Sequence, residues 1–297
     1  MHHAILGPGG IGGLMGATLA HIGERVTMVV RESALPSFPE VIHLESKLGT
    51  FDERVAKAAV VPASEVLWIT VKATQLDEAL LSVRESTAVG AVVPLLNGID
   101  HLAMLSRQFG ENKLVPATIA VESERVAPGR YLQPSPFVRL NLAERGRQWL
   151  GPVIARLEGL GVTSRYFDHD ATLMWSKIAV LAPLALSTTA ANTSIGGVIH
   201  DTTRREQVEA CVRESVAVAK AEGAEVDAES IIASIHRMPH GMRSSMQKDL
   251  EQGNPLELDA IAGPILRAAA RHSMAVPVTQ ALAIAVARRA GVSVPAA

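Results

Sequence analysis

The chain has 297 residues, of which 48% are hydrophobic and 20% charged, and its formal net charge is −2. This length suits two domains that each bury a core, and the composition is that of a globular protein. Because the net charge is weakly negative and only 3% of residues are aromatic, we expect neither nucleic acid nor a membrane surface as a partner.

The first expected element is a short apolar strand at residues 4–6, which runs directly into a glycine-rich turn. Its glycines follow the G-x-G-x-x-G spacing that a dinucleotide pyrophosphate requires between a strand and a helix. Gly7 can make the tight turn, Gly9 lets the backbone approach the phosphates, and Gly12 lets the helix pack on the strand. The helix expected at 11–22 would aim its free N–H groups at the anion. The predicted cofactor-binding residues of this turn are Gly7, Gly9, Gly10, Ile11 and Gly12.

A strand rich in β-branched residues, Arg25–Val30, completes a βαβ unit with a right-handed crossover. An NAD site places an acidic residue at the end of this strand, where it binds the ribose 2′-hydroxyl, but this chain has Arg31. A guanidinium there suits a 2′-phosphate, so we predict NADPH as the cofactor. In the alternative interpretation Arg31 only ends the strand in solvent and Glu32 binds the ribose.

Strands and helices continue to alternate as far as residue 167, which predicts an α/β fold with a Rossmann-type doubly wound sheet in residues 1–167. Residues 47–54 are expected to form a hairpin inserted in that sheet. The expected strands are 41–44, 55–61, 65–71, 91–96, 114–122, 137–142 and 162–167, and the expected helices are 75–86, 98–109 and 145–160.

Lys72 and Asn97 each follow a strand expected to be buried on both faces. Because ligands of such sheets bind beyond the carboxyl ends of the strands, both side chains should face the crevice of the glycine turn. Lys72 would add a second cation for the 2′-phosphate, and Asn97 would lie beside the nicotinamide or the substrate. A solvated lysine and an Asn-Gly turn without a ligand are equally consistent with the sequence.

From residue 168 onward the strand signal disappears, so residues 168–297 are predicted to form an all-helical substrate and catalytic domain. Its longest uncharged apolar stretch, 178–186, falls short of membrane-spanning length. The single cysteine, Cys211, lies in a helical pattern and excludes an intrachain disulfide, which favours a cytoplasmic location. The expected helices are 169–186, 204–222, 229–238, 256–271 and 278–290.

Two residues of the helical domain are candidates for acid–base chemistry, which the first domain does not supply. Lys177 has apolar neighbours, and a desolvated lysine with a depressed pKa could protonate a carbonyl oxygen as hydride reaches the carbon. The other interpretation is a lysine that snorkels from a helix edge. Glu257, near a helix start, is either its partner or a solvated carboxylate placed favourably by the helix dipole. No metal site is predicted.

The motifs together resemble the ketopantoate reductases, over nearly the whole chain. The segments that carry the resemblance are 7–12, Thr-Val-Lys-Ala at 70–73, Leu-Asn-Gly at 96–98, Trp-Ser-Lys at 175–177, 244–249, 257–259 and Gly263. The resemblance implies NADPH-dependent reduction of 2-dehydropantoate to pantoate, on the route to pantothenate. It also implies roles for several residues: Lys177 as general acid, Glu257 holding the lysine and the substrate hydroxyl, Asn97 near the nicotinamide, Ser245 at the substrate carboxylate, and Arg31 with Lys72 at the 2′-phosphate.

The chain departs from the family pattern on the helix of Lys177. Family members commonly carry asparagines one and two turns after the lysine, where this chain has Leu181 and Ala185. Asn192 is similar to a further family asparagine, and hydroxyls at 187–189 could compensate in part. Each lost amide contact is worth ~0.5–1.5 kcal/mol, so we expect preference for a bulkier or less polar 2-oxo acid.

Two other classes of function are compatible with the sequence. One is an NADP(H)-binding sensor without catalysis, which the loss of both asparagines favours and the presence of Lys177 and Glu257 opposes. The other is a two-domain hydroxy-acid or opine-type dehydrogenase. The sequence does not indicate the number of subunits, and a homodimer is one assembly compatible with it.

Overall fold

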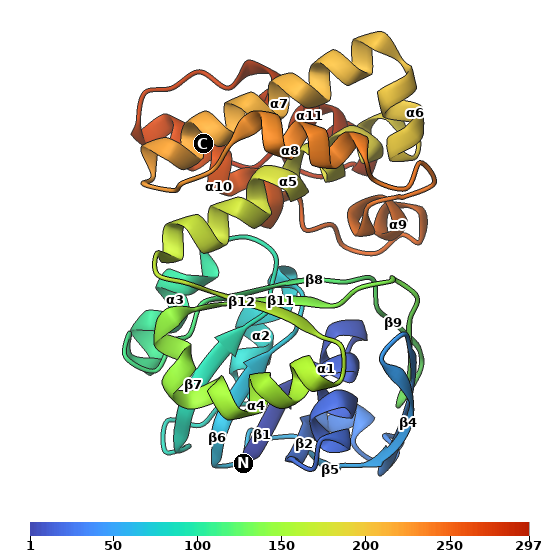
Figure 1. Cartoon of the computed structure of the whole chain (residues 1–297), viewed down its shortest axis with the longest axis vertical. Helices are drawn as coiled ribbons and strands as arrows, with labels where there is room; N and C mark the ends of the chain where they lie inside the picture. Colours follow the sequence, from blue (N-terminus) through green and yellow to red (C-terminus); the bar gives the residue numbers. More distant parts are fainter. Residues whose placement is uncertain (297) are drawn as a thin grey trace. The chain divides into compact units, whose positions relative to one another are not determined.

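A five-stranded parallel sheet organises the first part of the structure, a computed structural model that describes residues 1–296. In its centre Ile5 of β1 lies in register with Met28 of β2 on one side and Trp68 of β6 on the other. The predicted α/β fold with a doubly wound parallel sheet is confirmed (Figure 1). In sheet order the strands are β5 (Ala56–Ala58), β2 (Arg25–Val29), β1 (His2–Leu6), β6 (Ser64–Ile69) and β7 (Val89–Pro94).

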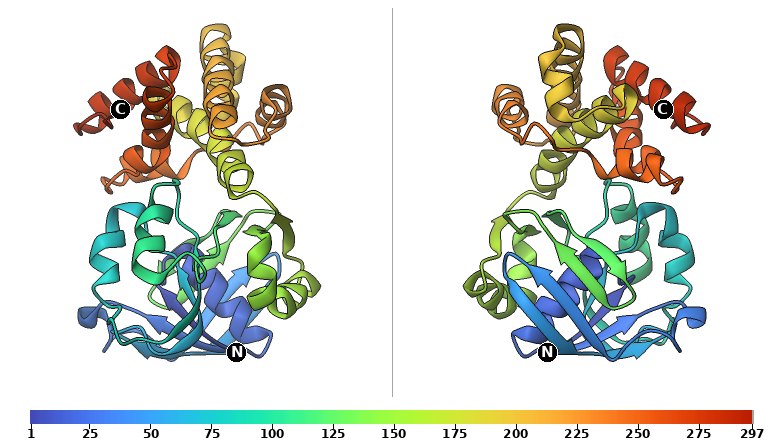
Figure 2. Two further views of the ribbon diagram at one scale, coloured as in Figure 1. Left: turned by 90° about the vertical axis from the view of Figure 1, so that its left-hand side faces the viewer. Right: turned by 90° about the vertical axis from the view of Figure 1, so that its right-hand side faces the viewer.

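Both faces of this sheet are buried, which explains the unbroken apolar runs of its strands. Alternate side chains enter different clusters: Ile5 and Trp68 pack on one face, and Leu6 and Leu67 on the other. Helices α1 and α4 cover the first face, and α2 and α3 cover the second (Figure 2). These helices are α1 (Gly10–His21), α2 (Leu76–Leu80), α3 (His101–Phe109) and α4 (Arg147–Gly159).

The hairpin expected inside the main sheet belongs to a second sheet, so that part of the prediction is wrong. Along β3 the buried residues alternate, with Ile42 and Leu44 inside, and this pattern suits a sheet buried on one face. The turn at Pro128–Gly129 makes another hairpin of the same sheet, where Gly129 has a φ of +69°. The second sheet is β4 (Gly49–Arg54), β3 (Val41–Ser46), β10 (Arg130–Gln133) and β9 (Glu124–Ala127), and the third is β12 (Thr163–Phe167), β11 (Arg139–Ala143) and β8 (Ala117–Ala120).

The helix expected at 75–86 ends at Leu80, because the chain forms tighter turns after that residue. The Ser82 hydroxyl donates to the Ala79 carbonyl at 2.7 Å, and the Val83 amide donates to the Leu80 carbonyl at 3.0 Å. Such side-chain bonds to nearby carbonyls compete with the helical ladder. The Ser82 carbonyl then accepts the Val61 amide at 2.9 Å, which ties the turn to the loop between β5 and β6.

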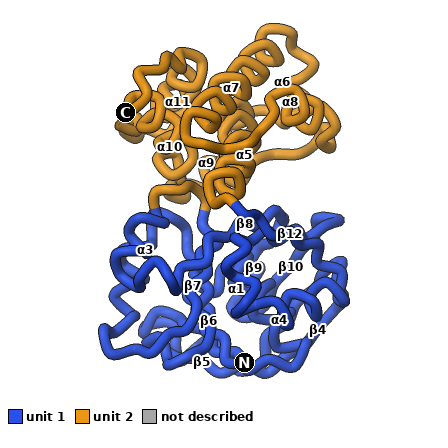
Figure 3. The backbone as a smooth tube through the Cα atoms, turned by 60° about the vertical axis from the view of Figure 1, so that its left-hand side comes forward, with its two compact units in different colours: residues 1–96, 101–168 blue, residues 97–100, 169–297 orange. Residues whose placement is uncertain are grey.

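The chain divides into two compact units, and each unit contains two separate segments of the sequence. The first unit is Met1–Leu96 with His101–Asp168, and the second is Asn97–Asp100 together with the chain from His169 onward (Figure 3). The sequence placed the change of domain between residues 167 and 168 and assigned Asn97 to the first domain. In the structure, Asn97–Asp100 packs with the helical unit instead.

The second unit is built around one long helix, α5, whose neighbours are the other helices of the unit. Its all-helical character is as predicted. The sequence missed α6 and α9 because helices of 6 and 7 residues are too short to show a helical period. The sequence signal for these two helices lies in Ser194 and Ser244. Each serine caps its helix, because its hydroxyl accepts a hydrogen bond from a backbone amide of the first turn. The helices are α5 (Asp170–Ala191), α6 (Ile195–His200), α7 (Thr202–Ala221), α8 (Ala228–His236), α9 (Ser245–Glu251), α10 (Leu258–Arg271) and α11 (Pro277–Ala290).

Helix α5 is longer than the apolar stretch seen in the sequence. By length and composition alone its 22 residues could cross a membrane, because the helix extends beyond the uncharged stretch 178–186. In the structure 67% of its most apolar window is buried inside the unit. The hydropathy of α5 is therefore that of a central core helix.

Candidate active site

The glycine turn between β1 and α1 is held tightly by its surroundings. Gly7 has a φ of +90°, and a Cβ there would collide with the Val71 side chain. A Cβ on Gly12 would overlap the Gly7 carbonyl and lie 2.5 Å from the Thr70 hydroxyl. That hydroxyl also bonds the Gly7 carbonyl at 2.8 Å, which fixes the turn. Packing within the protein therefore explains why Gly7 and Gly12 are glycines.

Gly9 is different, because, apart from its own chain neighbours, no heavy atom of residues 1–296 lies within 4 Å of the position its Cβ would take. Its φ of −73° is accessible to any residue, and no side chain caps the helix start that follows it. Neither packing nor backbone conformation requires glycine here. The open space above Gly9 and the free start of α1 fit a dinucleotide phosphate, as the sequence predicts.

A Gly9→Ala variant tests whether glycine is needed at this position for packing within the protein or for nucleotide binding. We expect its melting temperature to stay within about 1 °C of wild type, because the methyl group enters open space. The dissociation constant for NADP(H), measured by titration calorimetry, should rise about ten-fold or more, because the methyl group occupies the space of the phosphates. Gly159→Ala is the matched control, since that Cβ also meets nothing within 4 Å. Unchanged nucleotide affinity in Gly9→Ala would contradict the assignment.

Arg31 and Lys72 follow β2 and β6, as expected. Arg31 is an exposed residue whose Nη2 lies 3.3 Å from the Glu78 Oε2 on α2. Lys72 is half-buried and precedes the short 3-10 turn Ala73–Gln75. Glu32, the alternative ribose ligand, is also exposed. The sequence did not indicate Glu78, which brings a carboxylate to the guanidinium proposed for a 2′-phosphate.

Asn97 and Glu257 meet within the helical unit. The Asn97 Nδ2 donates to the Glu257 Oε2 at 2.9 Å, although 160 residues separate them. Glu257 is only 7% exposed and stands immediately before α10. An ionised carboxylate at such depth needs polar partners, and the Asn97 amide is one of them. The solvated alternative for Glu257 is therefore wrong.

Lys177 lies on the first half of α5, where its side chain is largely withdrawn from water. Burial lowers the pKa of Lys177 to about 8, while the negative charge of Glu257 acts in the opposite direction. A lysine at a solvated helix edge would keep a pKa near 10.5, so the lowered pKa favours the desolvated lysine over the snorkelling one. An ammonium with a pKa near neutrality suits a group that gives up and regains a proton.

The positions that depart from the family pattern follow Lys177 along α5. Leu181 is half-buried against the apolar core of the unit, and Ala185, 1% exposed, is inside that core. Of the hydroxyls expected to compensate, Thr188 donates to the Leu184 carbonyl at 2.8 Å and to Ser244 at 2.9 Å. The buried Ser187 hydroxyl has no hydrogen-bond partner within residues 1–296. Position 185 and the Thr188 hydroxyl are therefore parts of the helical core.

Asn192 and Ser245 are both exposed, at the end of α5 and the start of α9. Asn192 has a φ of +50° and caps α5, a left-handed conformation that asparagine tolerates. Ser245 follows Ser244, which is buried and caps α9. A capping role explains Asn192 without a substrate, whereas nothing in its surroundings accounts for Ser245.

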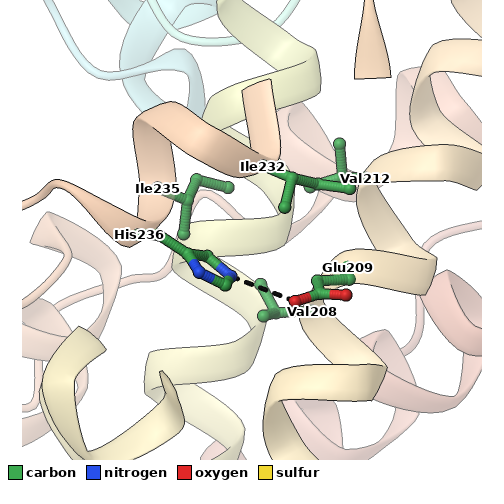
Figure 4. Close-up of a pocket in the computed structure, with 6 residues that line it drawn as sticks. All are labelled: Val208, Glu209, Val212, Ile232, Ile235 and His236. Atoms are coloured by element: carbon green, nitrogen blue, oxygen red, sulfur yellow. Dashed lines mark hydrogen bonds and ion pairs between the residues drawn. The ribbon is translucent and has the colours of Figure 1, made fainter. Parts of the chain in front are cut away.

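A small depression between α7 and α8 contains none of these residues (Figure 4). Its walls are mostly apolar, and its polar pair, Glu209 and His236, is joined by a 3.0 Å hydrogen bond. Because this pair is satisfied within the protein, we assign the depression no ligand. Within residues 1–296, no cluster of three His, Cys, Asp or Glu side chains could hold a metal ion.

A doubly wound unit with a dinucleotide turn, joined to a helical unit with a half-buried lysine and a buried carboxylate, defines the class of two-domain nicotinamide-type oxidoreductases. Residues 3–151 match the family model Ketopantoate reductase PanE/ApbA, and residues 171–290 match its C-terminal counterpart. The chain belongs to the ketopantoate reductase family.

Curated relatives agree with this membership, and solved structures share the fold. A 2-dehydropantoate 2-reductase of Caulobacter vibrioides is 29% identical over 92% of this chain and 94% of its own length. One of Mycobacterium tuberculosis is 30% identical over 73% and 74%. A PanE/ApbA family ketopantoate reductase from Ralstonia eutropha has a TM-score of 0.86 at 21% identity, covering 98% of this chain and 99% of its own. A D-mandelate dehydrogenase solved with NADH and anilino(oxo)acetate has the same TM-score at 19% identity, with 98% and 99% coverage.

Proposed function

We propose that this oxidoreductase uses NADPH to reduce a 2-oxo acid, 2-dehydropantoate or a related compound, to the 2-hydroxy acid. The half-buried Lys177, whose ammonium is stabilised by the negative charge of Glu257, is the observation that supports this chemistry most strongly. When bound, the nicotinamide would supply the hydride to the carbonyl carbon. The glycine turn would bind its pyrophosphate, and Arg31 with Lys72 would neutralise the 2′-phosphate.

In the proposed mechanism Lys177 acts as the general acid. Its Nζ donates a hydrogen bond to the carbonyl oxygen and transfers the proton as negative charge develops there. Glu257 stabilises the ammonium before transfer, and the hydrogen bond from Asn97 keeps one carboxylate oxygen in place. The Glu257 carboxylate is also the proposed contact for a substrate hydroxyl, and Ser245 and Asn192 are the proposed polar contacts for the rest of the substrate.

The proposed substrate has a bulkier or less polar side chain than 2-dehydropantoate. Leu181, half-buried one turn after Lys177, offers no hydrogen bond, and Ala185 is closed inside the core. An apolar wall of this kind favours an apolar substituent, since a hydroxyl placed against it loses its hydrogen bonds with water.

A steady-state panel with NADPH tests the proposed reaction. We expect kcat/KM for 2-oxo acids with branched apolar side chains to exceed that for 2-dehydropantoate about two-fold or more, since Leu181 lacks an amide contact worth ~0.5–1.5 kcal/mol. A clear preference for 2-dehydropantoate with a low KM would refute the altered specificity. Failure to reduce any 2-oxo acid would refute the reductase itself.

The same panel repeated with NADH tests the cofactor. We expect wild type to prefer NADPH, and Arg31→Leu to lower kcat/KM with NADPH about ten-fold or more while leaving NADH unaffected, because a charge-assisted bond to the 2′-phosphate is lost. Glu78→Gln should raise kcat/KM with NADPH about two-fold, since it removes an exposed carboxylate that competes with the 2′-phosphate for Arg31. Glu85→Gln, an exposed residue of the same unit, is the control. A wild-type preference for NADH would favour Glu32 as the ribose ligand.

The remaining expectations are also proposals: a small-molecule partner only, a cytoplasmic location and a homodimer.

Cys211 is a buried free thiol, and burial raises its pKa to about 12, so it is unreactive in the folded unit.

A further inference from the structure

Residues 97–100 leave the sheet unit and pack against the helix that follows Glu257. Asn97 bonds the Glu257 carboxylate, and Ile99 packs on the apolar core of the helical unit. Between them Gly98 has a φ of +91°, and a Cβ there would lie 2.7 Å from the Ala260 carbonyl. The segment therefore touches α10 closely enough to exclude even a methyl group.

One arginine of α10 joins this segment to the residues beside Glu257. The Arg267 Nη2 lies 2.6 Å from the Asp100 Oδ2, and its Nη1 lies 2.8 Å from the Asp259 Oδ1. Asp100 comes three residues after Asn97, and Asp259 two residues after Glu257. Arg267 thus bridges the two pieces of backbone that carry the Asn97–Glu257 pair.

The Arg267 guanidinium lies against Gly263 on α10, where the absence of a side chain makes space for it. A Cβ on Gly263, one turn before Arg267, would overlap the guanidinium. The Arg267 side chain is 28% exposed, whereas Asp100 and Asp259 are 54% and 69% exposed, so the guanidinium is the shielded member of each pair. The planar fork of arginine can hold two carboxylates in a fixed relation, which a lysine ammonium does less well.

We propose that Arg267 is a positioning residue that holds Asn97 on Glu257 by bridging Asp100 to Asp259. This inference rests on the proposed function of Glu257 and Lys177. The hydrogen bond at Asn97 and the ion pair at Asp100 fix both ends of the four-residue segment. With the Asp100 end released, Asn97 would hold the Glu257 oxygen for a smaller fraction of the time, and Glu257 would be less well oriented toward Lys177.

Arg267→Met tests the proposal against Arg271→Met, a control on the same helix whose ion pair goes to Glu222. We expect Arg267→Met to lower kcat for the 2-oxo acid about ten-fold with the dissociation constant for NADPH unchanged, and Arg271→Met to stay within about two-fold of wild type. Asp100→Asn, which preserves shape and leaves the Asp259 pair, should give most of the same loss. It serves as the second variant if Arg267→Met does not fold.

A double-mutant cycle with Asn97→Ala distinguishes positioning from general destabilisation. If Arg267 acts through Asn97, adding Arg267→Met to Asn97→Ala should lower kcat by less than about two-fold more. Multiplicative losses, or an Arg267→Met enzyme equal to Arg271→Met, would overturn the proposal.

A readout without turnover separates this inference from the proposed function. The Nδ2 protons of Asn97, assigned by their absence from the nitrogen-edited NMR spectrum of Asn97→Ala, should exchange with water about five-fold faster in Arg267→Met and Asp100→Asn than in wild type. Equal exchange rates would overturn the bridge even in an active enzyme. Faster exchange in a wild-type protein that reduces no 2-oxo acid would support the bridge and refute the proposed function.

Discussion

Replacement of Lys177 with methionine is expected to lower kcat for 2-oxo acid reduction about 1,000-fold, within the ~10²–10⁴-fold range of general acid catalysis. Methionine is similar in length and apolar, so it suits the partly buried site on α5, but it has no proton to give. The measurement is the steady-state oxidation of NADPH at saturating substrate, with nucleotide affinity determined in parallel.

Lys220→Met is the matched control, since Lys220 is an exposed lysine on α7 of the same unit. Nucleotide affinity should be unchanged in both variants. Turnover of Lys177→Met within about two-fold of wild type would exclude Lys177 as the acid. A wild-type protein that binds NADPH but turns over no 2-oxo acid, whether or not Lys177 is present, would favour the sensor function.

The rate of reduction is expected to be full below about pH 8 and to fall as pH rises through that value. The proton donor is the ammonium form of Lys177, and burial lowers its pKa to about 8, so the donor is lost above that pH. In Glu257→Gln the fall should move to lower pH. The carboxylate of Glu257 raises the pKa of Lys177, and its removal leaves the lowering by burial unopposed.

The profiles of kcat against pH for wild type and Glu257→Gln measure this shift directly. Glu225→Gln, which removes an exposed carboxylate of the same unit, is the control and should leave the fall in place. A fall that stays at the wild-type pH in Glu257→Gln would show that another group carries the transferred proton. A fall near pH 10.5 in wild type would show that Lys177 titrates as a solvated lysine.

Local patterns in the sequence were sufficient for the parts of the molecule whose causes are local. The glycine spacing after β1 places the turn, and the unbroken apolar runs of β6 and β7 predict strands buried on both faces. The run that contains Lys177 predicts a helix but leaves open whether the lysine is desolvated or snorkels to water. Each of these depends on residues a few positions apart, where helical or strand period and backbone conformation are set.

The pairing of Asn97 with Glu257, and the bridge that Arg267 makes to Asp100, were decided only by the tertiary structure. The bridge joins residues 167 positions apart, and no period or spacing connects them. The same holds for β3 and β4, whose hairpin the sequence indicated but whose sheet it did not. Which strand or helix a segment packs on depends on the burial of complementary surfaces brought together by the whole fold. For this protein the sequence therefore determined the elements and the kinds of chemical group, and the tertiary packing decided which groups meet.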